Sequence, residues 1–160
     1  MSSLTSTRRR RIAGPLVTTL LLLGAAMLAQ AGEFFEKNGI ALDGYDPVGY
    51  FSDQKPVRGS TEFTAEYKGS MFHFASASHR DQFRAAPEKF VPQFGGFCAY
   101  GAAGGYKAKI EPEAFSIIDG KLYLNYNAKV QSEWSKDTNG YIAKAEKQWP
   151  AMSTQTKVIP

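Results

Sequence analysis

Apolar and polar residues alternate in two neighbouring runs near the middle of the chain. Residues 61–67 (TEFTAEY) place Phe, Ala and Tyr on one face, which is typical of a half-buried strand. Residues 70–75 (SMFHFA) place both phenylalanines on one face, so Met71 and His73 point to the other. Because only Lys-Gly separates the two runs, the pattern predicts a β-hairpin.

A second hairpin is predicted nearer the C-terminus. Residues 114–118 (AFSII) and 121–126 (KLYLNY) are rich in residues that favour strands. Between them stands Asp119-Gly120, a strong signal for a two-residue hairpin turn. No segment of the sequence repeats.

Helical patterns follow both hairpins. Residues 77–90 have helical character, with Ser78 as the expected N-cap and Asp81 three residues later. Residues 127–136 continue into apolar positions spaced by four, up to Pro150, where we expect the helix to end. The chain is therefore predicted to be a small single α+β domain, in which two β-hairpins pack with short helices.

The N-terminal segment has the three parts of a secretory signal peptide. Arg8–Arg11 give a basic start, residues 12–28 carry no charge, and Ala-Gln-Ala ending at Ala31 is a small-residue cleavage pattern. We expect residues 1–31 to be removed after Ala31, which predicts a periplasmic or secreted protein that meets the membrane only through its export signal. An uncleaved N-terminal anchor is the alternative.

Removal of that segment changes the charge balance. Its four arginines leave with no acid, so 15 basic residues face 15 acidic ones in the remaining chain. Nucleic acid is therefore not an implied partner. Residues 32–150 are enough for one domain with a single core, followed by a polar tail over 151–160.

Several blocks, in the right order, resemble the exported YHS-domain proteins. The resemblance runs from about Gly39 to Pro150 and includes a Trp-Pro pair at its end. It implies a treble-clef-like core and an association with copper handling. The blocks are GYDPVGYF (44–51), YKGSMFHFASASHRDQF (67–83), PEKFVPQFGGFCA (87–99) and IDGKLYLNYN (118–127).

The chain departs from the thiolate-rich members of that family. They carry cysteine after Asp-Pro-Val and in a Phe-Cys-Ser-x-x-Cys pattern, where this chain has Gly49, Ala75 and His79. The segment Gly-Gly-Phe-Cys-Ala around Cys98 instead resembles a single-cysteine subgroup, some members of which carry selenocysteine. That resemblance implies that Cys98 is chemically active.

The residues themselves leave the role of Cys98, the only cysteine, open. Gly95 and Gly96 let backbone amides approach an anion or a bound cofactor closely. With His73, His79 and Met71 as further donors, Cys98 would suit a soft metal ion such as copper. The alternatives are a small buried hydrophobic residue at Cys98 and solvated or packed histidines.

Three functions follow from this donor set. The leading hypothesis is binding or handling of copper at Cys98 with His73 or His79. The second is a thiol redox protein in which Cys98 is the catalytic thiol and a partner protein reduces it. The third is a non-catalytic interaction module with a structural cysteine.

Asp46 is expected to shape the turn before Pro47. No Ser-His-Asp arrangement is evident in the sequence. Whether the protein is an enzyme stays open.

Overall fold

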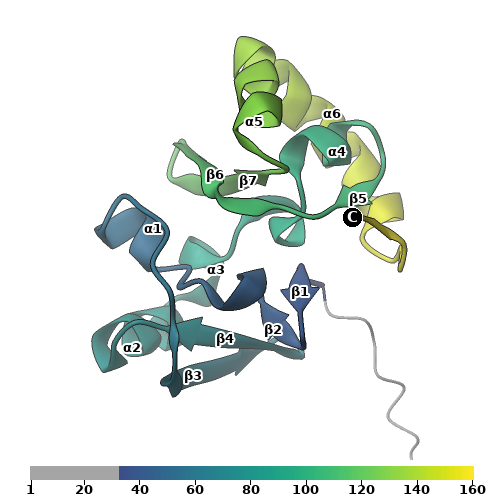
Figure 1. Cartoon of the computed structure of the whole chain (residues 1–160). Coiled ribbons are helices and arrows are strands. Elements are labelled where there is room, and N and C mark those ends of the chain that lie inside the picture. Colours follow the sequence, from purple (N-terminus) through teal and green to yellow (C-terminus); the bar gives the residue numbers. More distant parts are fainter. Residues whose placement is uncertain (1–32) are drawn as a thin grey trace, which may run out of the picture.

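Two β-hairpins, each followed by a helix, lie in opposite halves of the molecule (Figure 1). The structure is a computed structural model that describes residues 33–160, so the predicted signal peptide and its cleavage site lie outside the described residues. The first hairpin consists of β3 (Ser60–Tyr67) and β4 (Ser70–Phe74), and the second of β6 (Glu111–Ile118) and β7 (Lys121–Asn125). Both predicted hairpins and the α+β class are confirmed.

The first half is built around a four-stranded sheet. Its strand order is β1-β2-β4-β3, with β2 parallel to β4 and the other pairs antiparallel. The remaining elements of this half are β1 (Glu36–Lys37), β2 (Ile40–Ala41), the 3-10 turn η1 (Leu42–Gly44), α1 (Gly49–Ser52), α2 (Ala77–Ala85) and α3 (Pro87–Phe90).

The second half packs helices around its hairpin. It also contains η2 (Gln93–Gly96), α4 (Ala99–Ala103), β5 (Lys107–Ala108), α5 (Ala128–Trp134), η3 (Ser135–Asp137), α6 (Thr138–Met152) and β8 (Val158–Ile159).

The end of α6 differs from the prediction. Pro150 lies inside the helix, which runs on to Met152. The proline lacks one amide hydrogen, but the helical bonding resumes beyond it because the Ser153 N–H donates to the Trp149 carbonyl. The tail then returns as β8, which pairs in parallel with β5.

The two hairpins repeat one another in register. Tyr67 pairs with Ser70 in the first, and the residues 51 positions later, Ile118 and Lys121, pair in the second. Each hairpin contains a register shift, and the two shifts also lie 51 residues apart, after Ser60 and after Glu111. The backbone therefore contains an internal repeat that the amino-acid pattern does not reveal.

The turns and helix caps repeat with the same spacing. Gly69 and Gly120 occupy the second turn position with φ of 78° and 73°. After each second strand, a side chain caps the helix: Ser76 accepts from the His79 N–H and Asn127 from the Val130 N–H. The predicted cap at Ser78 is wrong, because Ser76 has the extended backbone that lets its hydroxyl reach the amide three residues on.

The aromatic packing of each hairpin on its helix also recurs. The rings of Phe72 and Phe83 lie 5.0 Å apart at 36°, and those of Tyr123 and Trp134, 51 residues later, lie 5.5 Å apart at 38°. Phe83 and Trp134 are each 1% exposed, so each helix is held by one buried aromatic side chain.

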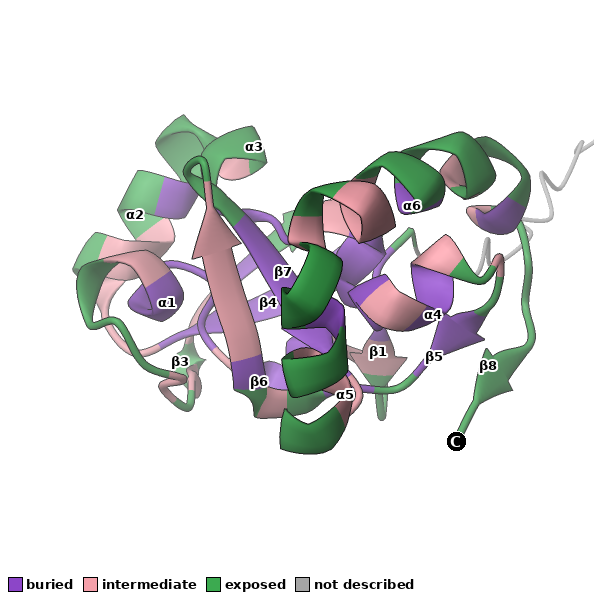
Figure 2. Ribbon diagram, turned by 90° about the horizontal axis from the view of Figure 1, so that it is seen from above, coloured by how far each residue is buried: buried purple, intermediate pink, exposed green. Residues whose placement is uncertain are grey.

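Strand β7 lies between two hydrophobic clusters. Leu122 and Leu124 join the cluster that contains the first hairpin, whereas Tyr123 joins the cluster formed with α4, α5 and α6. Figure 2 accordingly shows β7 and β4 as buried and the outer surface of α5 as exposed. Over residues 33–160, no helix combines the length and apolar character needed to cross a membrane.

Candidate functional site

Asp46 is the buried centre of the polar site in the first half. The residue is 0% exposed, and its Oδ1 accepts the N–H groups of Val48 and Gly49 at 2.8 and 3.3 Å. Its Oδ2 accepts the Ala75 N–H at 2.8 Å. The side chain thus shapes the turn before α1, as predicted, and also ties that turn to the end of β4.

Asp46 also holds an imidazole. Nδ1 of His79 lies 2.7 Å from Asp46 Oδ2, so in the neutral ring Nδ1 carries the proton and donates it to the carboxylate. The lone pair on Nε2 then faces outward toward the hydroxyl of Ser52, at 3.3 Å. The His79 side chain is 16% exposed, so this nitrogen lies at the edge of the surface. Carboxylate–imidazole pairs of this kind orient histidines that bind metal ions.

The hydroxyl of Ser52, which lies beside the outer nitrogen of His79, is in turn close to two further oxygen atoms. Ser52 Oγ is 3.0 Å from Oδ2 of Asp53 and 3.2 Å from the carbonyl oxygen of Val48. Ser52, His79 and Asp46 therefore form a row that the sequence analysis missed. The Ser52 hydroxyl has one proton and three possible acceptors: the Val48 carbonyl, the Asp53 carboxylate and His79 Nε2. Because the hydrogen bond to His79 is only one of these, the arrangement suits metal binding better than activation of the hydroxyl as a nucleophile.

Sequence reasoning placed Asp46 and His79 in separate roles. The two residues are 33 positions apart, and Asp46 begins the turn before α1 while His79 lies in the first turn of α2. No spacing rule connects such positions, so the pairing follows only from the packing of α2 against the end of β4.

Cys98 occupies a buried position at the start of α4. The residue is 2% exposed, its Sγ accepts the Gly101 N–H at 3.5 Å, and its thiol donates to Oδ1 of Asn125 at 3.7 Å. Burial raises the pKa of the thiol, against the opposing effect of the backbone amides of Gly101, Tyr126 and Tyr100. A protonated, enclosed thiol is the opposite of what a reactive cysteine requires.

Asp46 and Cys98 occupy corresponding positions of the internal repeat, although they lie 52 rather than 51 residues apart because the second half has one residue fewer between this position and the bonded carbonyl. The Asp46 N–H donates to the carbonyl of Val57, and the Cys98 N–H donates to the carbonyl of Ala108, 51 residues after Val57. Both side chains then accept the amide three residues on, at the start of a short helix. The family resemblance drew attention to Cys98, and the structure adds that its counterpart is a carboxylate.

The other predicted donors do not meet Cys98. His73 lies in β4, is 8% exposed, and has Gly59 packed against its backbone. Met71, on the same strand, is 37% exposed. Within residues 33–160 no group of three or more histidine, cysteine, aspartate or glutamate side chains is arranged to hold a metal ion. Among the described residues, the side-chain hydrogen bonds of Cys98 go to Asn125 and Gly101 and not to His73 or His79.

The two predicted cofactor-binding glycines admit other parts of the chain. Gly95 has φ +61°, and a Cβ there would collide with the carbonyl oxygen of Glu33. A Cβ on Gly96 would collide with the side chain of Leu42. Both glycines thus allow the N-terminal segment to pass close beneath η2.

A comparison with protein-family models shows which part of the chain is similar to a known family. Residues 48–94 match the YHS domain. The YHS segment includes His73, His79, Ser52 and Asp53 but ends before Cys98. The search of curated proteins gave no match, and neither did the search of solved structures. The match supports the YHS family predicted from the sequence, while the single-cysteine subgroup, export and selenoprotein relationship stay predictions.

Proposed function

We propose that this protein binds a divalent transition-metal ion reversibly, and that His79 is the principal ligand. The observation that carries the proposal is the hydrogen bond from His79 Nδ1 to the buried carboxylate of Asp46, which leaves Nε2 at the surface. The carboxylate fixes the ring orientation and makes Nε2 a better electron donor.

The chemistry of the neighbouring donors favours copper(II) among such ions. Imidazole nitrogen with carboxylate oxygen suits divalent copper, zinc and nickel, and copper(II) binds such ligands most tightly. Asp53 would supply the oxygen, with water completing the coordination. A metal ion held by so few protein ligands exchanges readily, which suits a carrier or sensor more than a structural site.

This proposal keeps the metal function predicted from the sequence but moves its centre. Cys98 would support the fold of the second half, because its thiol is enclosed and its pKa is raised by burial. The redox hypothesis loses support for the same reason, since it requires an accessible thiolate.

The test is a calorimetric titration of the purified protein with copper(II), and separately with zinc(II). We expect one site, and His79→Asn should weaken it at least about tenfold. His73→Asn is the matched control, because it removes the other histidine and should leave the affinity unchanged. Circular dichroism of each variant separates lost binding from lost fold.

Cys98→Ser distinguishes the two possible centres. We expect this variant to bind copper(II) like the parent. Loss of binding in Cys98→Ser with retention in His79→Asn would overturn the proposal and return the site to the thiol. Absence of saturable binding in the parent would overturn metal binding altogether.

We further propose that this function is exercised outside the cytoplasm, on the signal-peptide pattern of residues 1–31. N-terminal sequencing of the exported protein should begin at Gly32. A chain that retains Met1 and stays in the cytoplasm would exclude this location.

A further inference from the structure

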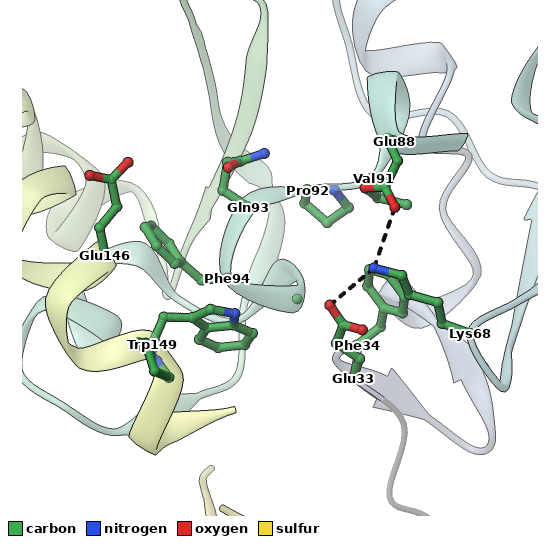
Figure 3. A pocket seen from close by; sticks show the side chains of 12 residues that line it. Glu33, Phe34, Lys68, Glu88, Val91, Pro92, Gln93, Phe94, Glu146 and Trp149 are labelled. Atoms are coloured by element: carbon green, nitrogen blue, oxygen red, sulfur yellow. Dashed lines mark hydrogen bonds and ion pairs between the residues drawn. The ribbon is translucent and has the colours of Figure 1, made fainter. Parts of the chain in front are cut away.

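A pocket of about 280 Å³ opens between the two halves of the molecule, away from the His79 site (Figure 3). None of Asp46, Ser52 or His79 lines it. One wall comes from the first half, with Glu33 and Lys68, and the other from α6 and η2 of the second half. The full lining is Glu33, Phe34, Lys68, Glu88, Val91, Pro92, Gln93, Phe94, Gly95, Glu146, Trp149 and Pro150.

The wall from the second half is aromatic. The rings of Phe94 and Trp149 pack against each other with centroids 5.9 Å apart. Gly95 lies against the indole, since a Cβ there would be 3.2 Å from its edge. In Figure 3 these two aromatic side chains face the charged wall across the pocket. An indole face attracts a cation more strongly than the other aromatic rings do.

The opposite wall is charged and carries an excess of carboxylates. Lys68 Nζ lies 3.4 Å from Glu33 and 3.4 Å from Glu88, which neutralises one of these two acids. The hydroxyl of Tyr67 donates to Glu88 and, with Lys68, lowers the pKa of that carboxyl, so Glu88 is ionised. A third carboxylate, Glu146, lies on α6, on the same side of the pocket as Phe94 and Trp149, and has no ion-pair partner among the described residues.

We propose that this pocket binds an organic cation: an alkylammonium or alkylguanidinium group with an apolar stem. Three carboxylates and one lysine leave the pocket with a net charge of −2. The apolar stem would lie against Phe94 and Trp149 while the cationic head reaches Glu146. The pocket is open to solvent and lined by parts of both halves, and ligand sites commonly lie at such junctions.

The proposal is tested with three ligands that share a four-carbon stem and differ in charge. n-Butylammonium, n-butanol and n-butyrate are titrated into the purified protein at constant ionic strength, while the indole N–H resonances of the protein are followed by NMR. Trp149→Phe assigns the two signals, because the only other tryptophan is the buried Trp134. We expect a saturable shift of the Trp149 signal with butylammonium, a much weaker one with butanol and none with butyrate.

Two variants test the charge argument without disturbing the core. Glu146→Gln should weaken butylammonium binding about two- to fivefold, as expected for one exposed charge contact. Lys68→Met should strengthen butylammonium binding, because the competing lysine cation is gone. In a pocket that binds anions, the same substitution would instead weaken the binding of butyrate. Glu62→Gln, on the exposed part of β3 outside the pocket, is the matched control and should change nothing.

A comparison with Nα-acetyl-lysine N-methylamide separates the two sources of such a cation. Tighter binding of this compound than of butylammonium would assign the pocket to a lysine side chain of a partner, and weaker binding to a free amine. Equal shifts with all three four-carbon ligands, or an unchanged affinity in both Glu146→Gln and Lys68→Met, would overturn the proposal. These results are independent of copper binding at His79, so the two proposals fail separately.

Discussion

The two halves of the molecule share a backbone arrangement but place different polar groups at its equivalent point. In the first half the Asp46 carboxylate accepts three backbone amides and the imidazole of His79. In the second half the Cys98 thiol accepts the Gly101 N–H, lies near the N–H groups of Tyr100 and Tyr126, and donates to Asn125. The same converging amides therefore support a charged group in one half and a weakly bonded neutral group in the other.

The difference continues at the first turn of the following helix. His79 and Val130 are equivalent, because each N–H donates to the capping side chain three residues earlier. Only His79 has a side chain that can bond the buried group with one nitrogen, Nδ1 to Asp46, and offer a second nitrogen to a ligand. The family match covers residues 48–94, which include His79 but neither Asp46 nor Cys98. The repeat therefore preserves the backbone arrangement, and the proposed metal site depends on two side chains, Asp46 and His79, that only the first half carries.

The largest expected effect on stability comes from removing the polar side chains of Asp46 and Cys98. Asp46→Ala should lower the free energy of unfolding by about 3–5 kcal/mol, because three buried amides and an imidazole lose their acceptor. Cys98→Ala should cost only about 1–2 kcal/mol, since it removes two weak hydrogen bonds and leaves a small cavity. Urea unfolding followed by circular dichroism measures both.

The ratio of the two losses matters more than either value. Equal losses would contradict the view that the first half holds a charge and the second does not. Asp46→Asn serves as the control for volume, because it fills the same space and removes the charge.

The next effect concerns the hairpin turns, where the two halves should behave alike. Gly69 and Gly120 have φ of +78° and +73°, and a Cβ at either would meet nothing within 4 Å. Gly69→Ala and Gly120→Ala should therefore each cost about 1–2 kcal/mol, through backbone strain alone. Thermal unfolding of the two variants tests this, and a loss in only one of them would show that the hairpins are not equivalent in energy.

The amino-acid pattern predicts the local elements better than the site. Lys-Gly and Asp119-Gly120 between alternating runs specify both hairpins, because turn chemistry and strand period agree there. The repeat escapes notice because the equivalent segments 60–85 and 111–136 share only three identical residues. What they share is register, capping and one buried aromatic pair, which different residues satisfy equally well.

The predicted site shows where such reasoning ends. Cys98 stands out in the sequence as the only cysteine, set among glycines, and in the fold Gly95 and Gly96 lie against Glu33 and Leu42. The contact between Asp46 and His79 depends on the position of α2 against β4, which no local pattern encodes. The sequence predicted His79 as a donor, but only the folded structure shows that Asp46 is its partner and how its ring is oriented.

A smaller effect is expected at the helix caps. Ser76→Ala and Asn127→Ala each remove a side chain that accepts an amide at the start of α2 or α5, and each should cost about 1 kcal/mol. Ser76→Ala should in addition weaken copper(II) binding, because the same turn positions His79. Asn127→Ala is its matched control and should leave the affinity for copper(II) unchanged.

The smallest expected effect is the pH dependence that Cys98 adds to the stability of the second half. Burial raises the pKa of this thiol above its ordinary value, so in alkaline solution the unfolded chain loses the thiol proton while the folded chain keeps it. The free energy of unfolding must then fall as the pH rises from about 8.5, the unfolded value, toward the raised value in the fold.

Cys98→Ser isolates that contribution. The variant should show a shallower decline in stability above pH 8.5, measured by urea unfolding at a series of pH values. Lys107, whose pKa is lowered by burial, acts in the opposite direction, but it is present in both proteins and cancels in the difference. A parent curve no steeper than that of Cys98→Ser would mean that the folded thiol ionises as readily as the unfolded one, and the second half would then hold an anion as the first half does.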